Sequence, residues 1–238
     1  MMGINCSLNE TVKGYILAFI MVSAELNGSG LRFNIDYPRE DENGLVEGRV
    51  LLLLSQNDEK EPRFQISDNS TTGFVFGVDA IGKQPSRGVT INGDVFGYPI
   101  ASLNDIPAGE YWVQGLIHKY ETFNLKTGHE VKLPMDRGEG QHWHSAPGNF
   151  YSEPKKITLD PKKRKTVSIT LDQVIAPIVP PEDTEYIKHI RIKSKLLTEF
   201  WGRPMHLGAH VLLPHGYDEH PDARYPLMVF HGHYPADF

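Results

Sequence analysis

In the stretch Ile106-Pro107-Ala108-Gly109-Glu110-Tyr111-Trp112-Val113, a Pro/Gly turn stands directly before a predicted aromatic-rich strand. Pro and Gly favour the backbone angles of tight turns, while aromatic and β-branched side chains suit the half-buried surface of a sheet. We expect this strand to continue to about Tyr120. The stretch indicates that the surrounding region is built from β-strands joined by turns.

Three segments before this turn carry strand patterns of their own. Apolar and polar residues alternate over residues 31–37, which predicts a strand with one face in the core. Residues 50–54 are apolar without interruption, as in a strand buried on both faces, and residues 74–78 are similar. Strand patterns of these two kinds therefore recur through the N-terminal half.

Two more strands are predicted over residues 157–159 and 167–171, and we expect them to form a hairpin around Asp160-Pro161. Several short strands separated by turn signals favour a β-sandwich. The Pro-Ala-Gly turn at residues 107–109 resembles that of immunoglobulin-like and transthyretin-like sandwich modules. We therefore predict a mainly β protein, with an immunoglobulin-like β-sandwich domain over residues 25–173.

A proline-rich segment, residues 174–184, marks the end of that domain. Proline at this density favours an extended, semi-rigid linker. Behind it we predict three strands, over residues 189–197, 207–213 and 225–230, with no helical periodicity of useful length between them. These strands belong to a second predicted domain, residues 185–238.

The second domain carries two motifs that resemble a known family. Leu227-Met228-Val229-Phe230 is continuously apolar and runs into His231-Gly232-His233, and an upstream strand ends in Leu213-Pro214-His215-Gly216-Tyr217. This order resembles the first strands and the oxyanion loop of α/β-hydrolases, in particular the enterochelin-type esterases. The resemblance implies that backbone N–H groups around His231, Gly232 and His233 help to bind the tetrahedral intermediate of acyl transfer. It also implies a small-molecule ester as substrate and no cofactor.

The catalytic serine that the resemblance implies is absent from the sequence. Such a nucleophile sits in a Gly-x-Ser-x-Gly elbow, and no serine of this chain has glycine two residues away on both sides. We therefore interpret the chain as an inactive N-terminal fragment of a serine esterase, with residues 185–238 as the truncated start of the α/β-hydrolase domain. The competing interpretation is a non-catalytic β-sandwich module that binds carbohydrate.

A polar loop rich in Gly and His, residues 135–149, is the other unusual segment. If this loop is extended, His142 and His144 point to one face, as two imidazoles that bind one metal ion must. Further metal ligands would come from His118, His129, Asp136 and Glu139. The alternative, which we prefer, is a structured loop with Trp143 packed inward and the imidazoles hydrogen-bonded.

The same loop offers two further roles. Trp143 and Tyr151 are candidates for contacts with an apolar or sugar-like substrate, since loops on a rigid β scaffold often carry function. Aromatic residues also pack between domains without any chemistry nearby. An interface contact is the interpretation that we favour over substrate contact.

The N-terminus predicts export. Lys13 precedes an apolar run, residues 15–22, that ends in Ser23-Ala24, which is typical of a signal peptide over residues 1–24. The run is too short to span a bilayer, for which a helix needs about 20 apolar residues. An ordinary buried segment or a misassigned start remains the alternative. We expect a secreted or periplasmic protein, and one without disulfides, because the single cysteine, Cys6, would leave with the leader.

The charge of the chain argues against nucleic acid as its partner. Lys and Arg number 24 against 30 Asp and Glu, a formal net charge of -6, whereas phosphate contacts require clustered cations. The one basic cluster, Lys162-Lys163-Arg164-Lys165, is short and lies between two predicted strands. We interpret it as the solvated tip of a hairpin.

Overall fold

The computed structural model describes residues 30–38, 46–81 and 88–230, and it is mainly β with several sheets. The strands up to the proline-rich segment are β1 (Leu31–Asp36), β2 (Gly48–Ser55), β3 (Phe74–Ala80), β4 (Val89–Ile91), β5 (Gly97–Tyr98), β6 (Gly109–Asn124), β7 (Glu130–Pro134), β8 (Phe150–Tyr151), β9 (Lys155–Leu159), β10 (Lys165–Thr170) and β11 (Gln173–Val174). Two short 3-10 helices, η1 (Pro62–Phe64) and η2 (Leu103–Asp105), lie in the connections. Behind the proline-rich segment follow β12 (Ile187–Lys193), α1 (Lys195–Trp201), β13 (His206–Leu212) and the 3-10 helix η3 (Tyr217–Glu219).

The long strand β6 organises the larger of two sheets in the first part of the chain. This sheet has the order β11-β8-β6-β2-β3-β5, and β7 and β9 also pair with β6. The smaller sheet has the order β10-β1-β4, with β1 parallel to β10 and antiparallel to β4. The turn before β6 is closed by the Tyr111 hydroxyl, which donates to the Pro107 carbonyl at 2.7 Å. The predicted strand after this turn is thus confirmed, and it runs on to Asn124.

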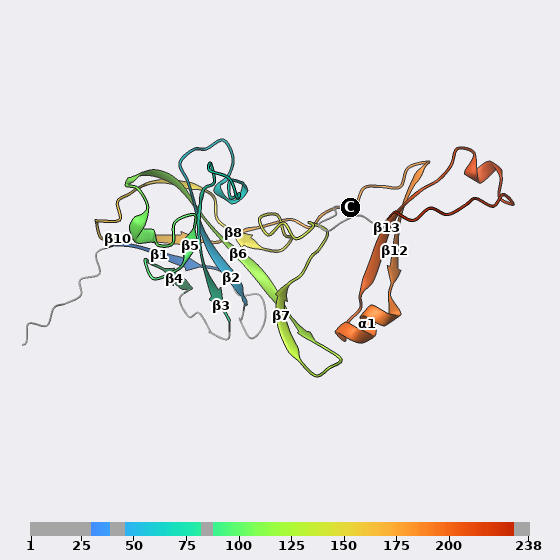
Figure 1. The fold of residues 1–238 in the computed structure, drawn as a ribbon, viewed down its shortest axis with the longest axis horizontal. Helices are drawn as coiled ribbons and strands as arrows, with labels where there is room; N and C mark the ends of the chain where they lie inside the picture. The colour runs from blue at the N-terminus through green and yellow to red at the C-terminus, as the bar shows by residue number, and fades with distance from the viewer. Residues whose placement is uncertain (1–29, 39–45, 82–87, 231–238) are drawn as a thin grey trace, which may run out of the picture.

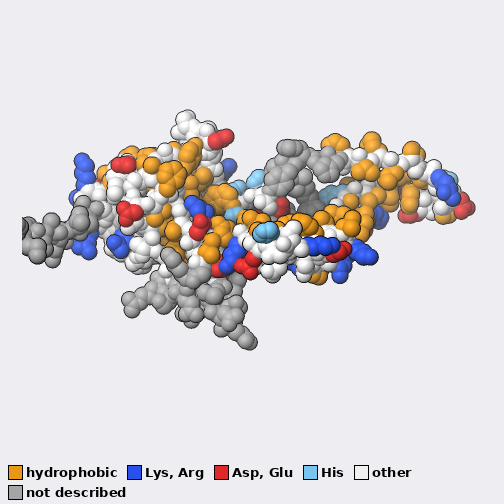
Figure 2. Space-filling view, turned by 60° about the horizontal axis from the view of Figure 1, so that its bottom comes forward, with side chains coloured by type: hydrophobic (Ala, Val, Ile, Leu, Met, Phe, Trp, Pro, Cys, Tyr) orange, Lys and Arg blue, Asp and Glu red, His pale blue; other side chains and the backbone are white. Residues whose placement is uncertain are grey.

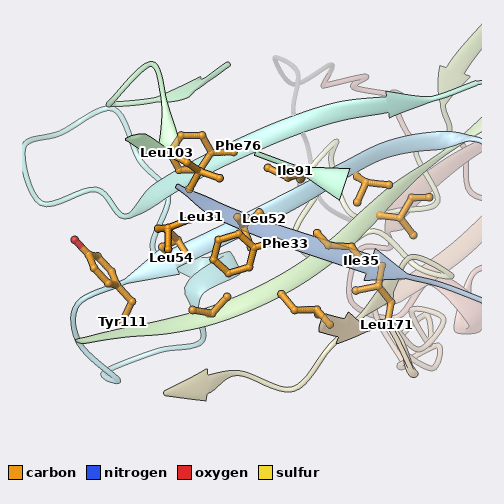
Figure 3. Packing of buried hydrophobic residues seen from close by; sticks show 14 of the residues in the cluster. Leu31, Phe33, Ile35, Leu52, Leu54, Phe76, Ile91, Leu103, Tyr111 and Leu171 are labelled. Atoms are coloured by element: carbon orange, nitrogen blue, oxygen red, sulfur yellow. The ribbon is translucent and has the colours of Figure 1, made fainter. Parts of the chain in front are cut away.

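The two sheets enclose one hydrophobic core (Figure 3). Alternate residues of β1 point into it, as the period-2 pattern predicts, because successive side chains of a strand face opposite sides. The larger sheet contributes residues of β2, β3 and β6 from the other side. Among the side chains with at most 2% exposure here are Leu31, Phe33, Ile35, Leu52, Leu54, Phe76, Ile91, Leu103 and Tyr111. Burial of each side chain of this size contributes roughly 1.5–3 kcal/mol.

The strand β2 is buried on both faces, as its uninterrupted apolar run predicts. Leu52 and Leu54 face the core between the sheets, while Leu51 and Leu53 belong to a second cluster on the outer face of the larger sheet. Outer-face burial requires a cover, and the loop 135–149 contributes to it through Trp143.

The hairpin expected around Asp160-Pro161 is wrong. β9 pairs antiparallel with β6 in the larger sheet, whereas β10 pairs with β1 in the smaller one. The turn at residues 160–164 therefore carries the chain from one sheet to the other. Leu159 and Ile169 enter the same core from its two sides, and this shared core is why both segments show the apolar pattern of a hairpin.

The C-terminal part forms a sheet of its own, made of β12 and β13 in antiparallel pairing. Figure 1 shows this hairpin apart from the two larger sheets, with α1 at the end where the chain turns back. The Ser194 hydroxyl caps α1 by accepting from the Leu197 N–H, and Gly202 ends it with φ 69°. We refer to residues 185–230 as the C-terminal unit.

Two of the three strands predicted for the C-terminal unit need correction. The strand expected over residues 189–197 ends at Lys193, because the Ser194 cap and Gly202 delimit a helix that the apolar pattern did not reveal. The segment 225–230 is not a strand, since none of the described residues pairs with it. The third strand, predicted over residues 207–213, is confirmed as β13. In the part of the chain that the structure describes, no helix has the length and apolarity needed to cross a membrane.

Candidate functional site

The loop 135–149 is a structured element that runs from β7 to β8. The Asp136 carboxylate accepts from the Gly138 N–H at 2.8 Å, and the buried Glu139 carboxylate accepts from the Arg137 N–H at 2.7 Å. The Asn149 side chain, also buried, donates to the Trp143 carbonyl at 3.0 Å and accepts from the Lys119 N–H of β6 at 3.1 Å. The bonds of Asp136, Glu139 and Trp143 order the loop internally, and the bond from Lys119 to Asn149 holds its C-terminal end against the larger sheet.

Trp143 and Tyr151 pack against the outer face of that sheet. Both are partly buried against the cluster formed by Leu51, Leu53 and Leu116. Trp143 therefore lies inward, as the interpretation of a structured loop expects. The structure brings these two candidate substrate contacts to the same apolar cluster.

His142 and His144 lie with their rings stacked, with centroids 5.4 Å apart. His142 is exposed, while burial lowers the pKa of His144, and the neighbouring His142 and Arg63 lower it further. The His144 Nδ1 atom is buried without a hydrogen-bond partner in the described part of the chain, so hydrogen bonding of this imidazole is not observed at that atom. The described residues also contain no group of three or more His, Cys, Asp or Glu arranged to hold a metal ion.

Arg63, in η1, is a buried cation beside this loop that the sequence did not reveal. Its guanidinium binds the Glu61 carboxylate through Nε at 2.9 Å and through Nη2 at 3.2 Å. It lies over the rings of Phe64 and Tyr151, at 4.5 Å and 4.1 Å from their centroids, and donates to the His144 carbonyl at 3.2 Å. Charge pairing and ring contacts of this kind stabilise a buried cation. Tyr151 is thus part of a packed arrangement around Arg63.

The motif that resembles the esterases begins at the end of β13. Gly216 has φ 69°, a conformation that glycine adopts without the strain a Cβ would bring, and the Tyr217 N–H donates to the Pro214 carbonyl at 3.2 Å. The rings of Tyr217 and Tyr225 lie 5.7 Å apart, so that the chain after the turn folds back. His231, Gly232 and His233 lie outside the described residues.

The segment before those residues is apolar and exposed. Leu227, Met228, Val229 and Phe230 have exposed fractions of 79–87%. On β12 and β13, Ile190, Ile192 and Leu207 are 41–57% exposed and lie on one face of the hairpin, because directly opposite residues of paired strands share a face. Figure 2 shows hydrophobic side chains along this part of the molecule.

A pocket with a volume of about 400 Å³ lies beside α1. Its lining consists of Lys193, Lys195, Thr198 and Glu199 and includes none of the predicted site residues.

No family model matches the chain, and neither the curated proteins nor the solved structures contain a match to it.

Proposed function

We propose that the chain is the N-terminal part of a secreted serine esterase, in which an immunoglobulin-like β-sandwich domain precedes an α/β-hydrolase domain that starts at β12. The observation that carries the proposal is the uncovered apolar surface of the C-terminal unit. Leu227 to Phe230 are 79–87% exposed, and one face of the β12–β13 hairpin is apolar. A sheet that continues into further strands and helices would bury such surface.

The motif after β13 also supports this proposal. The turn Leu213-Pro214-His215-Gly216-Tyr217 uses its glycine in a left-handed conformation, which explains why glycine stands at that position of the esterase-like pattern. The antiparallel β12–β13 hairpin precedes the apolar run that leads to His231-Gly232. Both features agree with the order of motifs in the enterochelin-type esterases.

The proposed reaction is hydrolysis of a carboxylic ester through an acyl-enzyme. A serine activated by a histidine and an Asp or Glu side chain attacks the ester carbonyl, and the alcohol leaves. Water then hydrolyses the acyl-enzyme and releases the carboxylic acid product. Backbone N–H groups near His231, Gly232 and His233 stabilise the oxyanion. The catalytic serine, histidine and acid belong to sequence that follows residue 238 in the proposed parent protein, and no cofactor takes part.

The experiment that tests this proposal compares two proteins. We expect no turnover of p-nitrophenyl acetate by residues 1–238, and turnover by the same chain extended with its natural downstream coding sequence. The extension must also encode a Gly-x-Ser-x-Gly elbow, whose serine is required for turnover. A natural stop codon directly after residue 238, or an extension without that elbow, would overturn the proposal.

A second candidate function is binding of carbohydrate by the proposed β-sandwich domain alone, residues 25–173, which we call the β domain. Phe96 and Tyr98, which flank Gly97 in and beside β5, are 73% and 43% exposed, and exposed aromatic rings can stack on sugars. Affinity electrophoresis in gels with soluble polysaccharides tests this function. It predicts retardation that is lost in Phe96→Ala, whereas unretarded migration in all gels rejects it.

A further inference from the structure

Phe123, near the end of β6, is buried in an unexpected place. It is 4% exposed, yet it belongs to neither hydrophobic cluster of the two sheets. At this point β6 has left the larger sheet and pairs with β7 alone among the described strands, through residues 120–124. A two-stranded hairpin cannot bury a phenylalanine by itself, so another part of the chain covers it.

The cover comes from the C-terminal unit. The indole of Trp201 meets the Phe123 ring edge-on, with centroids 5.1 Å apart, and the Arg203 guanidinium lies 4.1 Å from the centre of the same ring. Trp201 is the last residue of α1, and Arg203 follows its glycine cap. An edge-on aromatic contact and a cation over a ring each favour this arrangement.

Glu121 anchors the same contact electrostatically. One oxygen of its carboxylate pairs with Arg203 and the other with Arg137 of the loop 135–149. The three side chains are 27–33% exposed, so water screens these pairs less than it screens pairs at the open surface. Glu121 therefore connects the C-terminal unit with the loop on the larger sheet.

A backbone hydrogen bond completes the contact. The Lys126 N–H, in the turn between β6 and β7, donates to the Phe200 carbonyl of α1 at 3.2 Å. The Lys126 ammonium pairs with Glu199 at 2.6 Å, although both side chains are more than half exposed. Residues 199–203 thus touch the β6–β7 hairpin through apolar, ionic and backbone contacts.

We propose that the β6–β7 hairpin, residues 120–134, is a docking arm that holds the C-terminal unit in place by binding residues 199–203, with Glu121 and Phe123 as the residues that determine the affinity. The arm then restrains the C-terminal unit by a second connection besides the proline-rich segment. The proposal concerns this intramolecular interface and does not depend on the esterase chemistry.

Amide hydrogen exchange of the full chain, measured by NMR, tests the proposal at Lys126. Its N–H donates to the Phe200 carbonyl only when residues 199–203 lie on the arm. We expect Glu121→Gln and Arg203→Gln each to lower the protection of this amide by about tenfold or more, because each removes the partly buried Glu121–Arg203 ion pair that joins the arm to the C-terminal unit. Amides of β2 report whether the β domain stays folded.

Glu110→Gln is the matched control, since Glu110 lies on the same strand and pairs with Lys156. This variant should leave the protection of Lys126 unchanged. Unchanged protection in Glu121→Gln and Arg203→Gln would overturn the proposal. If Glu121→Gln also exposed the amides of β2, Arg203→Gln would decide, because it leaves the Glu121–Arg137 pair in place.

Discussion

Leu52 offers the simplest single-residue test of how the two sheets pack. It is fully buried in the core between them. Leu52→Ala leaves a cavity there, and we expect the free energy of unfolding to fall by about 2–5 kcal/mol in urea titrations. Leu133→Ala, on β7 and 45% exposed, should lower it by less than about 1 kcal/mol. Equal effects of the two substitutions would contradict the packing described for β2.

Two partly buried imidazoles predict how stability depends on pH. Burial lowers the pKa of His144, with smaller effects of His142 and Arg63, and burial together with Arg137 lowers the pKa of His118. Only the unfolded chain then takes up these protons near pH 6.5. The free energy of unfolding should therefore fall as the pH drops through about 6.5, and level off below the pKa values of the folded protein.

His144→Gln should make this pH dependence shallower, because one of the two titrating groups is removed. His129→Gln, at an exposed position, is measured in parallel as the control substitution. Denaturant unfolding between about pH 7.5 and pH 5.5 measures both. A slope in His144→Gln equal to that of the unsubstituted protein would show that His144 is not held neutral by the fold.

At the scale of elements, the strands that line the core were the easiest to predict from the sequence. The alternation in residues 31–37 and the apolar run at 50–54 locate β1 and β2, because each face of a strand has one environment. Pairing was harder to foresee. β9 and β10 follow one another with a turn between them, as in a hairpin, but tertiary packing assigns them to different sheets. The helix α1 was missed because it is seven residues long, too short to show periodicity.

Gly97 in β5 tests the close approach of that strand to β3. A Cβ on Gly97 would lie 2.2 Å from the Phe76 ring and 2.8 Å from the Val75 carbonyl. We expect Gly97→Ala to lower the free energy of unfolding by about 1–3 kcal/mol, since a packed core resists added atoms. Gly109→Ala, where the nearest atom is 4.0 Å away, should cost less. A smaller cost for Gly97→Ala would contradict the β3–β5 pairing.

At the scale of the whole molecule, residues 176–184 are the expected site of proteolysis. All are exposed and carry neither helix nor strand. Brief digestion should cut first between Val174 and Glu185 and leave a folded core from the β domain, with the C-terminal unit degraded or aggregated because its apolar surface is uncovered. Mass spectrometry of the fragments identifies the cut. First cleavage within residues 46–81 or 109–124 would contradict this domain organisation.

The candidate site was only partly predictable, because its contacts join residues far apart in the sequence. The loop 135–149 stood out by composition, and its inward tryptophan followed from simple packing. Arg63 and His144 are 81 residues apart, and Glu121 and Arg203 are 82 apart. No local pattern marks such partners, since neither a surface-type charge nor a backbone carbonyl shows in the sequence which distant residue the fold will bring to it.

The central claim, that this chain belongs to a serine esterase, is tested most directly by covalent labelling. The protein carrying residues 1–238 and the natural sequence that follows should react with a fluorophosphonate, which forms a stable adduct with an activated serine. We predict one adduct, located by peptide mass spectrometry on the serine of a Gly-x-Ser-x-Gly elbow beyond residue 238. No adduct, or an adduct on a serine within residues 1–238, would contradict the claim.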